Sequence, residues 1–295
     1  MNSLYILSAK MEFHSKTVVI TGASTGIGRA CALRLDQAGW LVFAGVRKVA
    51  DAEALREAAS TRLTPVFIDV SDAGSIATAV TIVEDVVGSI GLSGLVNNAG
   101  IAVGGPLEFL SLERLRDQLE INVIGQIAVT QAFLPLLRQR QGRIVNMSSV
   151  SGRLAAPFIG PYSASKFALE ALTDALRGEL HPWGIRVVSV EPGSIATPIW
   201  NKALSLGSEI AAELPDQAHS LYDQVLEELM RTVEASGRRG ISTEVVARVV
   251  ERALTSRRPK TRYLVGVDAH VGALMSRLLP DRLRDWLILN FGGRS

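Results

Sequence analysis

The most informative stretch of this sequence is Thr21-Gly22-Ala23-Ser24-Thr25-Gly26-Ile27-Gly28, because of the segments that flank it. A short β-branched run, Thr17–Thr21, leads directly into it, and an amphipathic stretch, Gly26–Ala38, continues from it. Gly22 permits a tight turn, Gly26 lets the backbone approach a pyrophosphate, and Gly28 lets helix and strand pack closely. The helix N-terminus there offers unpaired N–H groups to a phosphate. The stretch therefore predicts a strand, a phosphate-binding turn and a helix.

The same alternation continues along the chain. Apolar runs without strict alternation are typical of parallel strands covered on both faces, and stretches of helical periodicity separate them here. This βαβα order predicts a doubly wound α/β fold, with a parallel sheet of seven strands flanked by helices in a single domain, residues 16–295. The predicted strands are Thr17–Thr21, Leu41–Val46, Thr64–Ile68, Gly94–Val96, Arg143–Met147, Arg186–Val190 and Tyr263–Val267, and the predicted helices are Gly26–Ala38, Ala50–Ala59, Ala73–Val87, Leu112–Arg138, Tyr162–His181 and Thr243–Thr255.

Composition narrows the function classes. Of the 295 residues 47% are hydrophobic and 20% charged, which suffices to cover both faces of a sheet, and a net charge of +2 argues against nucleic acid as a partner. The single cysteine, Cys31, falls on the inner face of a predicted helix, so we expect a core thiol, no disulfide and a cytoplasmic location. Residues 1–15 read as an N-terminal extension without signal-peptide features, and no uninterrupted apolar run approaches the roughly 20 residues of a membrane span.

The end of the second predicted strand, Gly45-Val46-Arg47-Lys48, is where a dinucleotide would place its adenine ribose. No acidic residue stands between Asp36, inside the first predicted helix, and Asp51 to accept from a ribose 2′-hydroxyl. Arg47 is instead placed to bind a 2′-phosphate, so we expect NADP rather than NAD. A solvated basic turn is the alternative, because Thr25 adds no second cation.

The next two strand ends supply further candidates for cofactor binding. Asp69, followed by Val70, is placed to accept from an adenine amino group, and it could also cap the helix that starts near Ser71. In Asn97-Asn98-Ala99-Gly100 the amides can tie strand ends together, and the small residues leave room for a cofactor. On its own, this tetrapeptide would be an ordinary turn.

Tyr162 and Lys166 stand four residues apart near the start of a predicted helix, so their side chains project from one face. A phenol titrates near pH 10, and a neighbouring ammonium favours its ionised form. Two charges about 4 Å apart at an effective dielectric near 20 attract by roughly 4 kcal/mol, or about three pKa units. We therefore expect Lys166 to lower the pKa of Tyr162 toward its working range as an acid and base.

Two polar residues could assist this pair. Ser149 ends the fifth predicted strand, where its hydroxyl can bond a substrate oxygen, with the adjacent Ser148 in reserve. Asn122 lies where the periodicity of Leu112–Arg138 predicts burial, and a buried amide needs partners. Taken singly, a serine or asparagine is more often structural than catalytic.

Residues 194–240 run from a strand end to the next clear helix start, with room for one or two helices of their own. Ligands of open α/β sheets bind beyond the carboxyl ends of the strands, so we expect a substrate lid, with a peripheral packing insertion as the alternative. Trp200, Leu204 and Leu206 could line an apolar pocket or pack within the lid.

The C-terminal strand and helix, residues 262–295, end in an amphipathic face. Leu283, Trp286 and Leu287 share this face, with Arg282 and Arg284 nearby, which would also suit a membrane surface. We expect docking on the core or on another subunit instead.

Together these motifs resemble the short-chain dehydrogenase/reductase family over roughly residues 16–198. The resemblance implies a Rossmann-type sheet and hydride transfer between a nicotinamide ring and the carbon of a small carbonyl or alcohol substrate, by a homodimer or homotetramer. The C-terminal Arg262-Tyr263-Leu264-Val265-Gly266 and Leu279-Pro280-Asp281 are similar to the branch acting on retinoids and hydroxysteroids. The matching motifs are TGASTGIG at 21–28, Asp69, NNAG at 97–100, Asn122, Ser149, YSASK at 162–166, and Pro192-Gly193 with Thr197.

The resemblance also implies a role for each site residue. Tyr162 would exchange a proton with the substrate oxygen, and Ser149 would orient and polarise that oxygen. Lys166 would bind the nicotinamide ribose and tune Tyr162, while Asn122 would hold a proton-relay water. The nicotinamide end would contact Pro192, Gly193, Ile195 and Thr197.

Other functions fit these residues less well. An epimerase or dehydratase on an extended version of the fold also uses a Tyr/Lys pair, but its glycine turn is usually spaced differently from the GxxxGxG found here. A non-catalytic nucleotide sensor would not require Ser149, Tyr162 and Lys166 together. The four histidines lack metal-ligand spacing, so we expect no metal.

Overall fold

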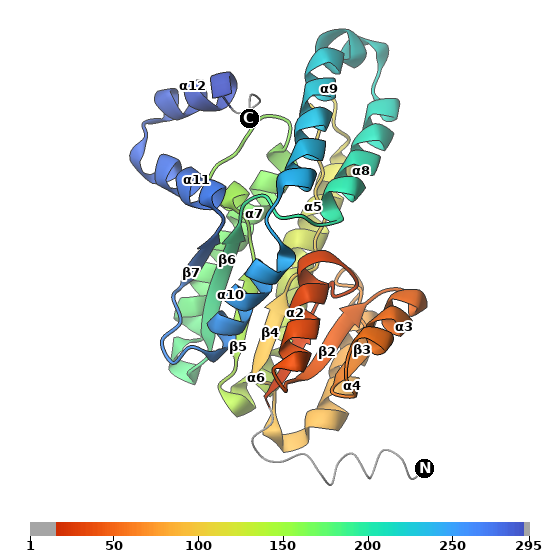
Figure 1. The fold of residues 1–295 in the computed structure, drawn as a ribbon, viewed down its shortest axis with the longest axis vertical. Coiled ribbons are helices and arrows are strands. Elements are labelled where there is room, and N and C mark those ends of the chain that lie inside the picture. The colour runs from red at the N-terminus through yellow and green to blue at the C-terminus, as the bar shows by residue number, and fades with distance from the viewer. Residues whose placement is uncertain (1–15, 292–295) are drawn as a thin grey trace.

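The computed structural model describes residues 16–291, apart from the side chains of Ser236, Arg238 and Phe291, so the expected N-terminal extension lies outside the described residues. A parallel sheet in the order β3-β2-β1-β4-β5-β6-β7 forms the centre, with helices on both faces (Figure 1). The prediction of a seven-stranded doubly wound sheet is confirmed. The strands are β1 (Thr17–Ile20), β2 (Leu41–Val46), β3 (Leu63–Phe67), β4 (Gly94–Asn97), β5 (Arg143–Met147), β6 (Arg186–Pro192) and β7 (Arg262–Val265).

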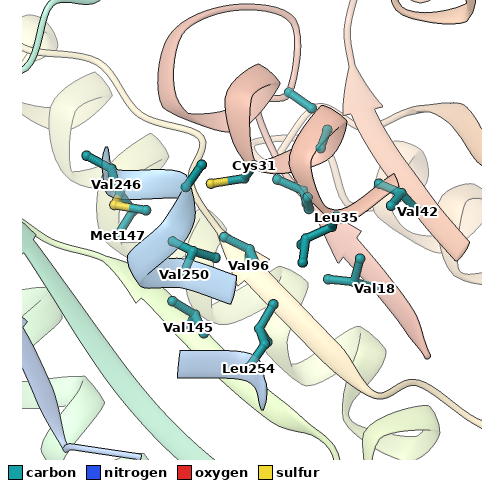
Figure 2. Packing of buried hydrophobic residues seen from close by; sticks show 14 of the residues in the cluster. Val18, Cys31, Leu35, Val42, Val96, Val145, Met147, Val246, Val250 and Leu254 are labelled. Carbon is teal, nitrogen blue, oxygen red and sulfur yellow. The ribbon is translucent and has the colours of Figure 1, made fainter. Parts of the chain in front are cut away.

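Successive side chains of a strand point to opposite faces, and the core divides accordingly into two clusters. Val18 and Ile20 of β1 pack under α2 (Gly26–Gln37) and α10 (Thr243–Thr255), while Val19 lies in the cluster beneath α4 (Ala73–Val87) and α6 (Gly125–Arg140). Figure 2 shows the first cluster, in which α2 and α10 meet over the sheet. Cys31 lies in this cluster as predicted, and burial raises its pKa to about 12.

The remaining helices lie around the sheet and beyond its carboxyl edge. They are α3 (Val49–Ala58), α5 (Leu112–Leu119), α7 (Gly160–Glu179), α8 (Ile199–Glu213), α9 (Asp216–Arg239), α11 (Val267–Leu278) and α12 (Asp281–Phe291), with short helical turns η1 (Gly88–Ile90), η3 (Val150–Gly152) and η4 (His181–Trp183). Residues 194–240 contain two helices, α8 and α9, which pack against each other, within the range that the sequence predicts.

The helix predicted over Leu112–Arg138 is confirmed as a continuous helical stretch, Leu112–Arg140, but its α-helical geometry is interrupted. A π-helical turn, η2 (Glu120–Ile124), separates α5 from α6. Asn122 sits inside this turn, and its amide bonds to the backbone of Ile101 outside the helix. Wide turns of this kind occur mostly within α-helices at functional sites, and hydropathy periodicity does not reveal them.

Two helical stretches of the described chain, Ala73–Ile90 and Leu112–Arg140, are long and apolar enough to cross a membrane by length and composition. Core helices pass the same test, and both stretches contribute buried residues to the cluster under the sheet, so they are weak evidence for a membrane span.

Of the two expected positions of the last helix, docking on the core is wrong, and docking on another subunit stays a prediction. The C-terminal part forms two helices after β7, and α12 stands away from the sheet (Figure 1). Leu283 is 46% exposed and Trp286 is 52% exposed, so this face of α12 is not buried against the core.

Candidate active site

A cavity of about 750 Å³ opens beyond the carboxyl ends of the strands, where doubly wound sheets bind their ligands. The glycine turn and the ends of β2 to β6 form its floor, and α8 and α9 form much of the opposite wall. Most of the predicted cofactor residues line it, namely Gly22, Ser24, Thr25, Gly26, Ile27, Arg47, Asp69, Val70, Asn98, Ala99, Gly100, Tyr162, Lys166, Pro192, Gly193, Ile195 and Thr197. Gly28 and Asn122 are the two predicted site residues that lie behind the wall.

The glycine turn has the backbone that the sequence predicts. Gly22 and Gly26 have φ angles of +64° and +58°, in the region that favours glycine. A Cβ at Gly28 would overlap the carbonyl oxygen of Gly22, so the start of α2 packs directly on the turn. Asn98 fixes the turn from β4, since its Nδ2 donates to the carbonyl oxygens of Thr21 and Gly22, each at 3.0 Å. This turn and the N-terminus of α2 fit a dinucleotide pyrophosphate.

The end of β2 carries more charge than the sequence motif alone indicates. Arg47 is joined on the cavity wall by Lys48 and by Asp51 of α3. A second cation is therefore present, supplied by the neighbour of Arg47 rather than by the glycine turn. Asp36 is buried and accepts from the backbone of Ser60 at 2.9 Å, so it is turned away from the cavity, as its helical position predicts.

Asp69 lies across from Arg47, with 3.7 Å between Oδ2 and Nη1. Its Oδ1 accepts from the hydroxyl of Ser71 at 2.7 Å and from the backbone N–H of the same residue at 3.1 Å. Hydrogen bonds from Ser71, assisted by Arg47, lower the pKa of Asp69. The alternative in which Asp69 caps the next helix is wrong, because α4 begins at Ala73 and Asp72 caps it by accepting from Gly74.

Ser149, Tyr162 and Lys166 converge on one side of the cavity. Helix α7 begins at Gly160, which places Tyr162 in its first turn and Lys166 one turn later on the same face. The hydroxyl of Ser149 accepts from the backbone N–H of Ser151 at 3.1 Å, and its interaction with Tyr162 lowers the pKa of that phenol. Ser149 is therefore the serine next to the phenol, as its spacing predicts.

Ser148 also reaches the cavity wall. Its hydroxyl is buried and has no hydrogen-bond partner within the described part of the chain, whereas its backbone N–H pairs with Val190 of β6 at 2.8 Å. The Ser148 hydroxyl therefore does not bond the phenol of Tyr162, and Ser149 remains the better candidate for a catalytic hydroxyl.

The electrostatics of the pair differ from the prediction. Burial raises the pKa of Tyr162, against the lowering effect of the Ser149 hydroxyl. The expected lowering by Lys166 is wrong. Burial also lowers the pKa of Lys166 to about 8, and Nζ donates to the carbonyl oxygen of Met147 at 2.8 Å. Nζ lies 5.7 Å from the centre of the Tyr162 ring. The prediction treated the ammonium as fully charged and close to the phenol, but desolvation acts on both groups.

Asn122 is fully buried behind the wall, and both ends of its amide are engaged. Oδ1 accepts from the backbone N–H of Ile101 at 2.9 Å, and Nδ2 donates to the carbonyl oxygen of Ile101 at 3.0 Å and to Ser165 at 3.1 Å. Ser165 lies on α7 between Tyr162 and Lys166. The amide therefore links the cavity-lining segment at Ile101 to the helix that carries the catalytic pair.

The segment after β6 forms the cavity wall near the catalytic side chains. Its backbone is held partly by Trp200 of α8, whose ring nitrogen donates to the carbonyl oxygen of Ile195 at 2.6 Å. Thr197 packs against Gly26, since a Cβ built there would lie 3.4 Å from Thr197. The end of β6 and the glycine turn thus approach each other across the cavity.

Helices α8 and α9 close the other side. Trp200 and Leu204 line the cavity as predicted, whereas Leu206 does not and packs against the small cluster of Val103, Leu110 and Ile210. Two polar contacts join these helices to the body of the protein: Arg114 with Glu213 at 2.8 Å, and Tyr222 with Glu108 at 2.9 Å.

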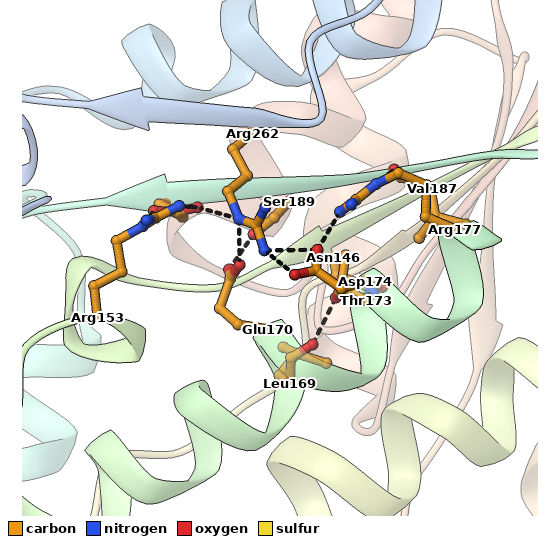
Figure 3. A network of polar contacts seen from close by, with 11 residues as sticks. Asn146, Arg153, Leu169, Glu170, Thr173, Asp174, Arg177, Val187, Ser189 and Arg262 are labelled. Carbon is orange, nitrogen blue, oxygen red and sulfur yellow. Dashed lines mark hydrogen bonds and ion pairs between the residues drawn. The ribbon is translucent and has the colours of Figure 1, made fainter. Parts of the chain in front are cut away.

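A network of charged side chains joins helix α7 to β6, β7 and the segment after η3 (Figure 3). Glu191 is fully buried on β6 and takes a bidentate contact from Arg153, which follows η3. Arg262 of β7 bonds Glu170 at 2.9 Å and Asp174 at 2.6 Å, both on α7. Burial raises the pKa of Glu191, against the opposing effect of Arg153. The network ties η3, β6, β7 and α7 together, and no local sequence pattern points to it.

Metal ligands do not gather in the described part of the chain, where no three His, Cys, Asp or Glu side chains form a cluster able to hold an ion. The cavity wall also contains residues that the sequence analysis did not assign to the site. Lys48 is one of them, and its position next to Arg47 in the sequence could have indicated it. Asp268, from α11, carries no local signal.

Comparison with known proteins agrees with this geometry. Residues 16–205 match the family model described as short chain dehydrogenase. The chain is 41% identical to 17-beta-hydroxysteroid dehydrogenase type 6 of Bos taurus, over 94% of this chain and 89% of that protein, and 40% identical to retinol dehydrogenase 5 of Mus musculus, over 91% and 86%. A short chain dehydrogenase from Burkholderia cenocepacia, solved in complex with NADP, superposes with a TM-score of 0.72 at 27% identity, covering 94% of this chain and 99% of that one. The chain therefore belongs to the short-chain dehydrogenase family of oxidoreductases, and its similarity groups it with the retinol and hydroxysteroid dehydrogenases.

Proposed function

We propose that this protein interconverts a carbonyl and an alcohol on an apolar substrate, with NADP(H) as the preferred cofactor. The observation that carries the proposal is the convergence of Ser149, Tyr162 and Lys166 in the same cavity as the glycine turn and Arg47. A dinucleotide along the floor would place its phosphates at the turn and its nicotinamide beside the catalytic side chains.

The bound cofactor would supply or accept the hydride. Tyr162 would donate a proton to the carbonyl oxygen during reduction and take it back during oxidation. Ser149, which lines the same cavity as the phenol, would orient and polarise that oxygen. Lys166 would bind the nicotinamide ribose. Asn122 would act from behind the wall by holding the Ile101 backbone and, through Ser165, helix α7.

The preference for NADP rests on the end of β2. Arg47 and Lys48 line the cavity there, and Asp36 is buried away from it. An arginine fork suits a 2′-phosphate, while the nearby Asp51 and Asp69 are the side chains that would favour NAD if they bound the ribose. The ion pair with Asp69 holds the Arg47 guanidinium over the cavity.

The apolar character of the substrate is supported by the wall opposite the catalytic residues. We assign residues 194–240 the role of a substrate lid, since α8 and α9 both contribute apolar side chains there. These side chains are Trp200, Leu204, Leu226, Leu229, Met230 and Val233. We further propose that the protein acts in the cytoplasm as a homodimer or homotetramer.

The test monitors nicotinamide absorbance during incubation with NADPH or NADH and a panel of retinal, ketosteroids, aldehydes and small ketones. We expect turnover with NADPH that is fastest on a bulky apolar substrate. Turnover on small polar ketones alone would contradict the apolar lid, and a faster reaction with NADH would contradict the role of Arg47. Binding of cofactor without turnover on any of these substrates would favour a nucleotide sensor.

A further inference from the structure

The first turn of α11 brings a carboxylate to the cavity from the C-terminal part of the chain. Asp268 is 74 residues from Ser194 in sequence, yet its Oδ2 accepts a hydrogen bond from the Ser194 backbone N–H at 2.5 Å. The residue remains exposed and forms part of the cavity wall, together with Pro192 and Gly193. It therefore touches the segment that lies beside the catalytic residues.

The backbone on both sides of this carboxylate leaves room for it. A Cβ on Gly193, at the end of β6, would overlap the Asp268 carboxylate. A Cβ on Gly266, at the end of β7, would also meet Oδ1. Gly266 has a φ angle of +107°, which a side chain rarely tolerates. Two glycines from neighbouring strands thus form the place in which this side chain sits.

A helix-capping role accounts for only half of the contacts. Oδ1 accepts from the backbone N–H of Ala269, within the first turn of α11. Oδ2 instead leaves the helix and bonds Ser194. The rest of this segment is held by backbone pairs, namely Gly193 to Val265 at 2.9 Å and Ile241 to Ser194 at 3.1 Å. Asp268 adds a side-chain hydrogen bond to these backbone pairs and so helps to fix the backbone at Gly193 and Ser194.

The charge of Asp268 has a second consequence. The oxidised nicotinamide ring carries a positive charge and the reduced ring does not. A carboxylate on the wall at this end of the cavity attracts the cation more than the neutral ring, and the exposure of Asp268 to water keeps this attraction modest.

We propose that Asp268 is a positioning residue of the cofactor site, which holds the Gly193–Ser194 backbone for the nicotinamide end and whose charge favours the oxidised dinucleotide over the reduced one. The inference rests on the nicotinamide cofactor of the proposed function. It extends the cofactor site to α11, well beyond the motifs of the first 200 residues.

The experiment measures the Kd of NADP⁺ and of NADPH for the full chain, by tryptophan quenching and nicotinamide fluorescence. Asp268→Ala removes both the acceptor and the charge. We expect the Kd of NADPH to rise by about tenfold, the scale of one charge-assisted hydrogen bond, and that of NADP⁺ to rise by about fiftyfold, because the loss of charge adds to the loss of the acceptor. Asp268→Asn keeps an oxygen that can accept from Ser194. We expect it to leave the Kd of NADPH within about twofold and to raise that of NADP⁺ about fivefold, a modest electrostatic effect.

Asp281→Asn is the matched control, because Asp281 is an exposed acid in the first turn of the neighbouring α12 and forms an ion pair with Arg284. If the wild-type protein binds both dinucleotides and neither Asp268 variant changes either Kd, the inference on Asp268 is overturned, while the proposed function is not. Equal weakening of both redox forms by Asp268→Asn would overturn the charge preference. Failure of the wild-type protein to bind either dinucleotide would overturn the proposed function as well. Thermal melts of all variants show whether α11 stays folded.

Discussion

Nζ of Lys166 lies 5.7 Å from the centre of the Tyr162 ring and donates its hydrogen bond to the carbonyl oxygen of Met147. The ammonium is thus anchored to the end of β5, while the phenol interacts with Ser149. Lys166 is buried and Tyr162 is partly buried, and this loss of hydration raises the pKa of Tyr162 and lowers that of Lys166 to about 8. Burial therefore shifts the titration of each group toward its neutral form.

The phenol of Tyr162 should be essential for turnover and dispensable for cofactor binding. We expect Tyr162→Phe to lower kcat by about 10² to 10⁴, the usual contribution of a general acid and base, with the Kd of NADPH nearly unchanged. Steady-state rates and fluorescence titration measure the two quantities. Tyr263→Phe, which removes a hydroxyl on β7 outside the cavity, is the control. Equal rates in Tyr162→Phe and wild type would refute the proposed role.

Lys166 should make stability depend on pH. Its folded pKa of about 8 lies below its ordinary value, so between these two pH values the unfolded chain holds a proton that the folded chain has lost. Stability therefore rises with pH across this interval, by roughly 3 kcal/mol at most. We expect the free energy of unfolding of wild type, minus that of Lys166→Met, to increase from pH 7.5 to pH 10.5 in urea titrations.

Lys48→Met, at an exposed lysine on the cavity wall, gives the baseline for this comparison. The difference in free energy of unfolding between wild type and Lys166→Met could instead stay constant with pH, like the difference for Lys48→Met. That result would show that burial of the charged Lys166 does not destabilise the folded state. The same Lys166 variant should also lose most of its kcat.

Arg47 should determine the choice of cofactor. Arg47→Asp removes the fork placed for a 2′-phosphate and adds a carboxylate that can accept from a ribose hydroxyl, so we expect the ratio of kcat/KM for NADPH to that for NADH to fall by about 10- to 100-fold. Arg56→Asp makes the same charge change on α3 outside the cavity wall. An unchanged ratio in Arg47→Asp would mean that this arginine serves only its pair with Asp69.

The charged network of Arg153, Glu191 and Arg262 should contribute to the free energy of unfolding. Arg153→Met removes the bidentate partner of Glu191, whose side chain is fully buried, and we expect a loss of about 3 kcal/mol in urea unfolding. Arg116→Met, which breaks an exposed pair with Glu113, should cost less than about 1 kcal/mol. Similar small losses in both variants would contradict this account of the network.

The loss in Arg153→Met should also grow with pH. Burial already raises the pKa of Glu191, and removal of the guanidinium raises it further. A carboxyl with a raised folded pKa contributes stability below its unfolded pKa, and this stability is lost as pH rises through the folded value. We therefore expect a larger deficit at pH 8 than at pH 5, and a deficit that shrinks as pH rises would contradict the assignment.

Several features of this protein are encoded in its sequence alone. The seven strands are encoded in apolar runs only four to seven residues long, and the glycine turn is encoded in neighbouring residues whose φ angles glycine permits. The i, i+4 spacing places Tyr162 and Lys166 on one face of α7, since helix geometry depends on local distance along the chain. These predictions succeeded because each depends on interactions between residues close in sequence.

Other features depend on contacts between segments far apart in sequence, and they emerge only once the layers are assembled. The π turn at Asn122 accompanies its bonds to Ile101, the charge network joins Arg153 to Glu191 and Arg262, and Asp268 reaches Ser194 from another strand end. The same limit explains the error on the pKa of Tyr162, because spacing shows that an ammonium is near but not how far both groups are desolvated. Burial is a property of the packed tertiary structure, and no local pattern records its extent.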